Sequence, residues 1–156
     1  MMELVIGIVS LGALVAFQSA MRRRGQRRFA GAWEEAQAEI ARGNHEAAAH
    51  QIAECIRLMP LWLPPRFLLG NLLARQGKLD AAEAQFKMAQ ALQPREAAGF
   101  VELGIFYITA ANRIDEGVSQ LQEALAHDAA AMRQIETDPR LQAFRETSAF
   151  AGLARA

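Results

Sequence analysis

Residues 63–96 read LPPRFLLGNLLARQGKLDAAEAQFKMAQALQPRE, and this 34-residue stretch decides the fold. Each of three residues within it has a like residue 34 positions earlier: Gly43 and Gly77, Ala48 and Ala82, Pro60 and Pro94. Self-similarity at this period is typical of stacked helical hairpins, because one hairpin is too small to bury its own apolar face. The sequence therefore predicts an all-α protein built as a short α-solenoid.

The repeat offset divides the middle of the chain into three helix-turn-helix units, at residues 29–62, 63–96 and 97–131. Helices are expected at residues 30–42, 45–58, 64–76, 79–92, 97–110 and 114–127. Gly43 and Gly77 should end the first helix of a pair, because glycine accepts positive φ without strain. The third unit needs one extra residue near Asn112 to stay in register, so its turn should differ. Gly70 and Gly104 should let paired helices approach closely.

After Ala131 the repeat pattern stops, and a different signal begins. The sequence Thr137, Asp138, Pro139 predicts a helix start, with Asp138 as the N-cap and Pro139 in the first turn. Residues 132–156 are therefore expected to form a C-terminal helix that caps the last hairpin, since the end of a solenoid must be covered. In the alternative interpretation, this helix lies in the binding groove until a partner displaces it.

An uncharged apolar run, LVIGIVSLGALVAFQSAM, occupies residues 4–21. As a helix it would reach about 27 Å, close to the thickness of the hydrocarbon core of a bilayer. We interpret residues 1–21 as a transmembrane anchor; a cleaved signal peptide and a buried helix of a soluble protein are the alternatives. Gly12, Ala16 and Ala20 recur at four-residue spacing, which leaves a homodimer through the anchor open.

The chain has no net charge, but its charges are unevenly distributed. Residues 22–28 form a basic juxtamembrane segment, which leaves 12 basic against 16 acidic residues from Phe29 onward. The segment contains Arg22, Arg23, Arg24, Arg27 and Arg28. These arginines predict an inner-membrane topology with the N-terminus outside and the repeats in the cytoplasm. The acidic balance of the repeats argues against nucleic acid as a partner.

Sequence motifs for chemistry are missing from the chain. There is no glycine-rich phosphate loop, no His-Glu-x-x-His pattern and only one cysteine, Cys55. We therefore predict a protein that is not an enzyme and has no cofactor or metal site. Cys55 is expected to pack as a small hydrophobic residue.

The second unit resembles the tetratricopeptide repeat (TPR) family at eight positions. These are Leu69, Gly70, Leu73, Gly77, Ala82, Phe86, Ala89 and Pro94. The resemblance implies a partner groove lined by the first helices, at the fifth and ninth positions of each unit: Trp33, Gln37, Phe67, Asn71, Val101 and Ile105. With Arg75 as a further polar residue, this strip suits an amphipathic helix or an extended apolar segment of another protein. Alternatively, Trp33 and Phe67 fill contacts between neighbouring repeats.

The order of anchor, basic segment and repeats is similar to the layout of the lipopolysaccharide assembly protein B family, although this chain lacks that family's C-terminal metal-binding module. The Ala- and Arg-rich composition indicates a bacterial source. We therefore expect a membrane-anchored TPR adaptor at the cytoplasmic face of a bacterial inner membrane. Two alternatives stay open: an outward-facing assembly factor for a secretion, pilus or cytochrome-maturation system, and a structural subunit of a larger membrane complex.

Overall fold

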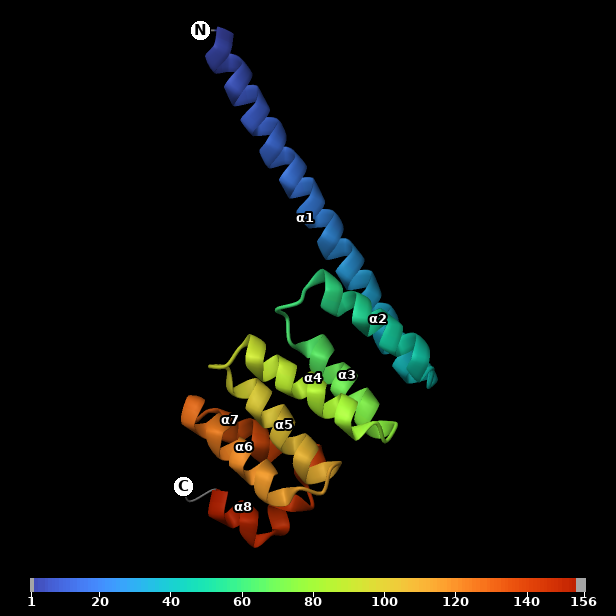
Figure 1. Ribbon diagram of the computed structural model, residues 1–156, viewed down its shortest axis with the longest axis vertical. Coiled ribbons are helices and arrows are strands. Elements are labelled where there is room, and N and C mark those ends of the chain that lie inside the picture. The colour runs from blue at the N-terminus through green and yellow to red at the C-terminus, as the bar shows by residue number, and fades with distance from the viewer. Residues whose placement is uncertain (1, 154–156) are drawn as a thin grey trace. The chain divides into compact units, whose positions relative to one another are not determined.

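The computed structural model describes the backbone of residues 2–153, with side chains described at residue 19 and from residue 22 onward. Throughout this part of the chain all regular structure is helical, which confirms the all-α prediction (Figure 1). The elements are α1 Met2–Arg42, α2 His45–Leu58, α3 Pro64–Arg75, α4 Leu79–Leu92, α5 Ala97–Thr109, α6 Ile114–His127, α7 Ala131–Thr137, the 3₁₀ turns η1 Pro139–Leu141 and η2 Phe144–Glu146, and α8 Ser148–Leu153.

The chain divides into two compact units, Met1–Pro60 and Leu61–Ala156. In the first unit, α2 packs against the C-terminal part of α1 (Figure 1). In the second unit, α3 pairs with α4, α5 pairs with α6, and α4 packs on α5. Each pair is a helical hairpin, and the second unit stacks two hairpins in succession.

Five of the six helices predicted from the repeat offset are confirmed to within one residue at both ends. The first helix differs, because α1 begins at Met2 and runs without a break through the basic segment to Arg42. Arginine and alanine are good helix formers and the stretch contains no proline, so nothing ends the helix before residue 30. The basic segment at residues 22–28 is thus part of a continuous helix.

The turns inside the hairpins use left-handed backbone conformations. Gly43 has a φ of 81° and Gly77 a φ of 73°, as expected for residues that end a helix. In the third hairpin Asn112 takes this conformation, with a φ of 54°. Asparagine tolerates this region better than most residues. The extra residue of the third unit is accommodated here, so the prediction of a different turn is confirmed.

In the α3–α4 and α5–α6 hairpins, glycines, which have no side chain, allow the paired helices to approach closely. A Cβ atom on Gly70 would lie 2.6 Å from the ring of Phe86, and one on Gly104 would lie 3.0 Å from the carbonyl oxygen of Gly117. Both glycines therefore act as predicted. Gly117 was not singled out from the sequence, yet it stands in its hairpin where Ala48 and Ala82 stand in theirs.

The C-terminal helix predicted from residue 138 is not one helix. The structure places α7 before Asp138, then two 3₁₀ turns and the short α8. Asp138 does cap, because its side chain accepts from the Arg140 amide, and Pro139 does begin the next turn. Helical structure is interrupted again at Thr147, whose backbone is extended, before α8 begins. These short pieces let the segment follow the surface of α5 and α6 instead of crossing it as a rod.

A polar network joins the second and third hairpins at Glu83 of α4. Its carboxylate accepts hydrogen bonds from the Tyr107 hydroxyl and the Arg113 guanidinium, both at 2.8 Å, and Lys87 lies 2.7 Å away. Arg113 also stacks over the Tyr107 ring at 4.3 Å. Burial raises the pKa of Glu83, but the hydrogen bonds from Lys87 and Tyr107 outweigh it, so the net pKa lies below the ordinary value.

We expect this network to make the free energy of unfolding decrease at acidic pH. A carboxylate with a lowered folded pKa stabilises the fold fully above its unfolded pKa, about 4.3, and loses this contribution as the pH falls through the folded value. Glu83→Gln should cost about 1 kcal/mol at pH 7 and much less near pH 3. Thermal unfolding at both pH values tests this, with the exposed Glu123→Gln as control. A constant cost of Glu83→Gln from pH 7 to pH 3 would contradict it.

Within the part of the chain whose side chains are described, no helix combines the length and apolar character needed to cross a membrane. The predicted anchor at residues 4–21 lies, except for Ser19, outside those side chains. Both the anchor and a homodimer through it therefore remain predictions.

Candidate protein-binding pocket

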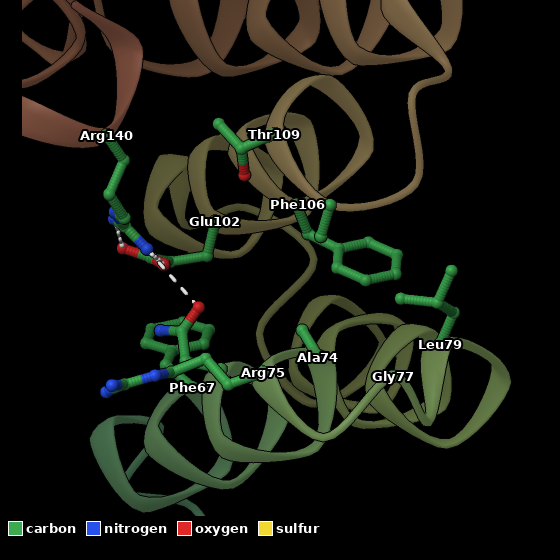
Figure 2. Close-up of a pocket in the computed structure, with 11 residues that line it drawn as sticks. Phe67, Ala74, Arg75, Gly77, Leu79, Glu102, Phe106, Thr109 and Arg140 are labelled. Carbon is green, nitrogen blue, oxygen red and sulfur yellow. Dashed lines mark hydrogen bonds and ion pairs between the residues drawn. The ribbon is translucent and has the colours of Figure 1, made fainter.

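An open pocket of about 910 Å³ lies in the second unit, where the first helices of its two hairpins run side by side (Figure 2). Most of its wall comes from α3 and α5, the turn after α3 and the start of α4 close one end, and η1 contributes one residue. The lining residues are Phe67, Asn71, Ala74, Arg75, Gly77, Leu79, Glu102, Phe106, Thr109, Ala110 and Arg140.

Helical periodicity explains why α3 presents a row of pocket residues. Phe67, Asn71 and Arg75 are four residues apart, which places them one above another on one face of the helix. Glu102 and Phe106 stand in the same relation on α5. The pocket is thus a short groove between two helix faces.

Polar groups gather on one side of the pocket around Arg140 (Figure 2). Its guanidinium donates two hydrogen bonds to the Glu102 carboxylate, at 2.9 and 3.0 Å, and lies 2.7 Å from Asp138. It also reaches the Asn71 side-chain oxygen at 3.4 Å. Burial opposes the charge of Arg140, but Asp138 and Glu102 outweigh it and hold its pKa above the ordinary value. Arg140 therefore stays charged and ties η1 to α5.

Arg75 differs from Arg140 because its charge is not matched. It is exposed, and among the described residues it has no hydrogen bond or ion pair. The opposite side of the pocket is apolar, with Leu79 and Phe106 side by side in Figure 2. Leu79 is 37% exposed, which is high for a large aliphatic side chain. The pocket thus combines an accessible apolar wall with an unpaired cation.

Three of the seven residues predicted to form the partner groove line this pocket: Phe67, Asn71 and Arg75. Trp33 and Gln37 belong to the first unit, where Trp33 is half-buried and stacks on Phe29 with ring centroids 6.4 Å apart, and Gln37 is exposed. A partner role for Trp33 and Gln37 stays a prediction.

Val101 and Ile105 do not line an open groove, which corrects the prediction from repeat position. They are 0% and 1% exposed. Residues of the C-terminal segment share one buried cluster with them: Ala131, Ile135, Leu141, Phe144 and Leu153. The chain's own end thus covers the inner face of α5 at these two positions, and no partner can reach them while it is in place.

Eight of the eleven lining residues were not predicted for the groove, among them Leu79, Glu102, Phe106 and Arg140. Glu102 and Phe106 each follow a predicted groove residue by one position, which is about 100° around a helix, so a different face of α5 lines the pocket from the one that carries Val101 and Ile105. No sequence pattern indicated that Arg140 would line the pocket, because Arg140 belongs to the segment after the last repeat.

The remaining candidate residues lie in the first unit. The predicted topology arginines are at residues 22–24, 27 and 28; all are exposed, and Arg28 pairs with Glu54 at 2.9 Å. Cys55 is fully buried, and burial is the main cause of its raised pKa, so it packs as the predicted small hydrophobic residue. Among the described residues no group of three or more histidine, cysteine or acidic side chains is placed to hold a metal ion.

Comparison with known proteins shows the fold and little more. No protein-family model matches the chain, and no curated protein matches its sequence. Solved structures do match, among them the crystal structure of MamA, a TPR-containing protein, with a TM-score of 0.52 and 18% identity. The match covers 63% of this chain and 57% of the MamA chain, so this chain spans a little more than half of that structure. The chain therefore has a TPR-like helical-repeat fold.

Proposed function

We propose that this protein is a scaffold that binds a segment of another protein in the pocket between α3 and α5. The observation that carries the proposal is the pocket itself, an accessible apolar wall beside an unpaired arginine where two successive hairpins meet. A solenoid of hairpins supplies an extended surface for binding another protein.

The shape of the pocket favours a peptide segment over a small metabolite. It is an open groove bounded by two helix faces rather than a closed cavity, and small-molecule sites bury most of their ligand. An amphipathic helix or an extended strand of a partner can lay one apolar face into such a groove. Aromatic side chains and arginine, here the half-buried Phe67 and the exposed Arg75, are common anchors in protein interfaces.

We further propose that residues 1–21 anchor the protein in a bacterial inner membrane and that the helical repeats that follow lie in the cytoplasm. The uncharged apolar run, followed at once by five exposed arginines, supports this topology. The layout is that expected from the resemblance to the lipopolysaccharide assembly protein B family. In sealed right-side-out vesicles, added protease should leave residues 61–153 intact; their digestion would favour the outward-facing assembly factor.

Site-specific crosslinking tests the binding role. A photoreactive residue replacing Asn71 should capture a defined protein in cells. Leu79→Glu in the same chain should reduce that capture at least about tenfold, because it places a charge in the apolar wall. Met88→Glu is the matched control: Met88 is 50% exposed on α4, outside the pocket, and its change should leave capture unaltered.

Phe67→Glu provides a second pocket variant, with hydrogen exchange of α3–α6 confirming that each variant is folded. If the captured set is the same in wild type, Leu79→Glu and Phe67→Glu, and all three are folded, the pocket is not the binding site.

A further inference from the structure

The charges that line the pocket are not balanced. Arg140 is matched by two carboxylates, Glu102 in the lining and Asp138 beside it, whereas Arg75 has no acidic partner. Arg140 already occupies Glu102 with two hydrogen bonds, so no lining carboxylate is left for an incoming cation. Arg75 keeps its N–H donors free among the described residues. The unpaired charge of the pocket is thus the positive charge of Arg75, in a chain that from Phe29 onward has more acidic than basic residues.

We propose that the pocket selects a protein segment in which an aspartate or glutamate side chain lies next to a large apolar residue. The apolar residue packs on Leu79, Phe106 and Ala74, and the carboxylate pairs with Arg75 on the opposite side. This inference rests on the proposed function and adds the chemistry of the partner to it.

The geometry of the two sides supports this occupant over a basic or neutral segment. Figure 2 shows the Arg75 and Arg140 side chains on one side of the pocket and Leu79 with Phe106 on the other. An anion entering on the arginine side gains a partner in Arg75 without breaking the Arg140–Glu102 pair. A lysine or arginine entering there would approach the uncompensated charge of Arg75 and would find Glu102 already paired with Arg140. Like-charge contact at an interface is a strong penalty, so the pocket should exclude basic segments.

The test is a selection from a random peptide library displayed on phage, using the whole chain in mild detergent as bait. Peptides selected on wild type should combine aspartate or glutamate with a nearby leucine, phenylalanine or similar residue. On Arg75→Glu bait the preference should reverse to lysine or arginine beside the same apolar residues. Arg95→Glu is the matched control, because Arg95 is exposed and outside the pocket, and it should select the wild-type set.

Binding measurements on the synthesised wild-type peptides complete the test. Arg75→Gln should weaken their binding about two- to fivefold, as for an accessible ion pair, and should flatten its dependence on salt. Leu79→Glu should abolish it. A wild-type set without excess acidic residues, or a set unchanged by Arg75→Glu, overturns this inference while leaving the proposed function standing.

Different results would contradict the proposed function itself. If no peptide is enriched, or if the enriched peptides bind Leu79→Glu as well as wild type, the pocket does not bind protein segments at all. If instead the chain binds a second copy of itself and Leu79→Glu separates the copies, the occupant is this chain and the inference of an acidic partner segment is overturned.

Discussion

Replacing Phe86 with alanine is expected to lower the free energy of unfolding of the second unit by about 3–5 kcal/mol. Phe86 is fully buried in the cluster of Ala82, Leu103, Phe106 and Tyr107, where its ring lies 5.3 Å from that of Phe106. The loss combines the transfer of a phenyl ring to water with the cavity that remains between α4 and α5. Hydrogen exchange of α3–α6 measures the effect on this unit alone.

The control for Phe86 is Met88→Ala on the same helix. Met88 is largely exposed, so this change should alter stability by less than about 0.5 kcal/mol. A cost for Phe86→Ala no larger than that of Met88→Ala would show that α4 does not pack on α5 as described.

A double-mutant cycle sharpens the Phe86 prediction. Gly70→Ala places a Cβ atom 2.6 Å from the Phe86 ring, so α3 and α4 would have to separate, at a cost of about 1–3 kcal/mol. In a Phe86→Leu background the ring is gone, and the same Gly70→Ala change should cost much less. If Gly70→Ala lowers stability equally in the wild-type and Phe86→Leu backgrounds, the added Cβ atom does not clash with the Phe86 ring.

Leu141→Ala should destabilise the second unit by about 2–5 kcal/mol, although Leu141 lies beyond the last repeat. Its side chain is fully buried with Val101, Ile105 and Ile135, so the C-terminal segment is part of the core rather than a cover laid over it. The same hydrogen-exchange measurement applies. The result separates a permanent cap from a segment that a partner displaces.

Leu61→Ala is the matched control for Leu141→Ala. Leu61 belongs to the same unit and is 63% exposed, so its truncation should cost less than about 0.5 kcal/mol. If Leu141→Ala is equally mild and leaves α5 amides protected, the segment contributes little to folding. The alternative of a groove-filling helix, released by a partner, would then be the better interpretation.

The hairpins could be predicted from the sequence because their signals are local. Gly43 and Gly77 end helices through a backbone conformation that glycine adopts most easily, and Gly70 permits one close contact with Phe86. Such constraints repeat at a fixed offset and need no knowledge of distant residues. The altered turn of the third hairpin could also be predicted from the sequence, because one extra residue is inserted near Asn112.

Only part of the pocket lining could be predicted from the sequence, because the positions of the other lining residues depend on contacts with distant segments. Phe67, Asn71 and Arg75 lie on one helix and share a periodic face, so they were found together. Val101 and Ile105 are equivalent in position but are buried by residues far later in the chain, around Leu141 and Leu153. No repeat pattern reports such a long-range contact.

The same lack of local information explains the error at the C-terminus. Asp138 and Pro139 correctly indicated a start, but the length of the helical turn that they begin is decided by the surface of α5 and α6. A 3₁₀ turn and an α-helix begin with the same signal. At Pro139–Leu141 tertiary packing, rather than the local sequence, determines that a 3₁₀ turn forms.

The segment from α7 to α8 has a consequence for how this architecture can lengthen during evolution. Its buried residues share one core cluster with α5 and α6, so these two helices and the segment form one module. A hairpin duplicated after residue 131 would find its docking surface already taken. A copy inserted ahead of α5 would instead meet another hairpin on each side, so longer descendants of this chain should gain their repeats in the middle and keep this ending.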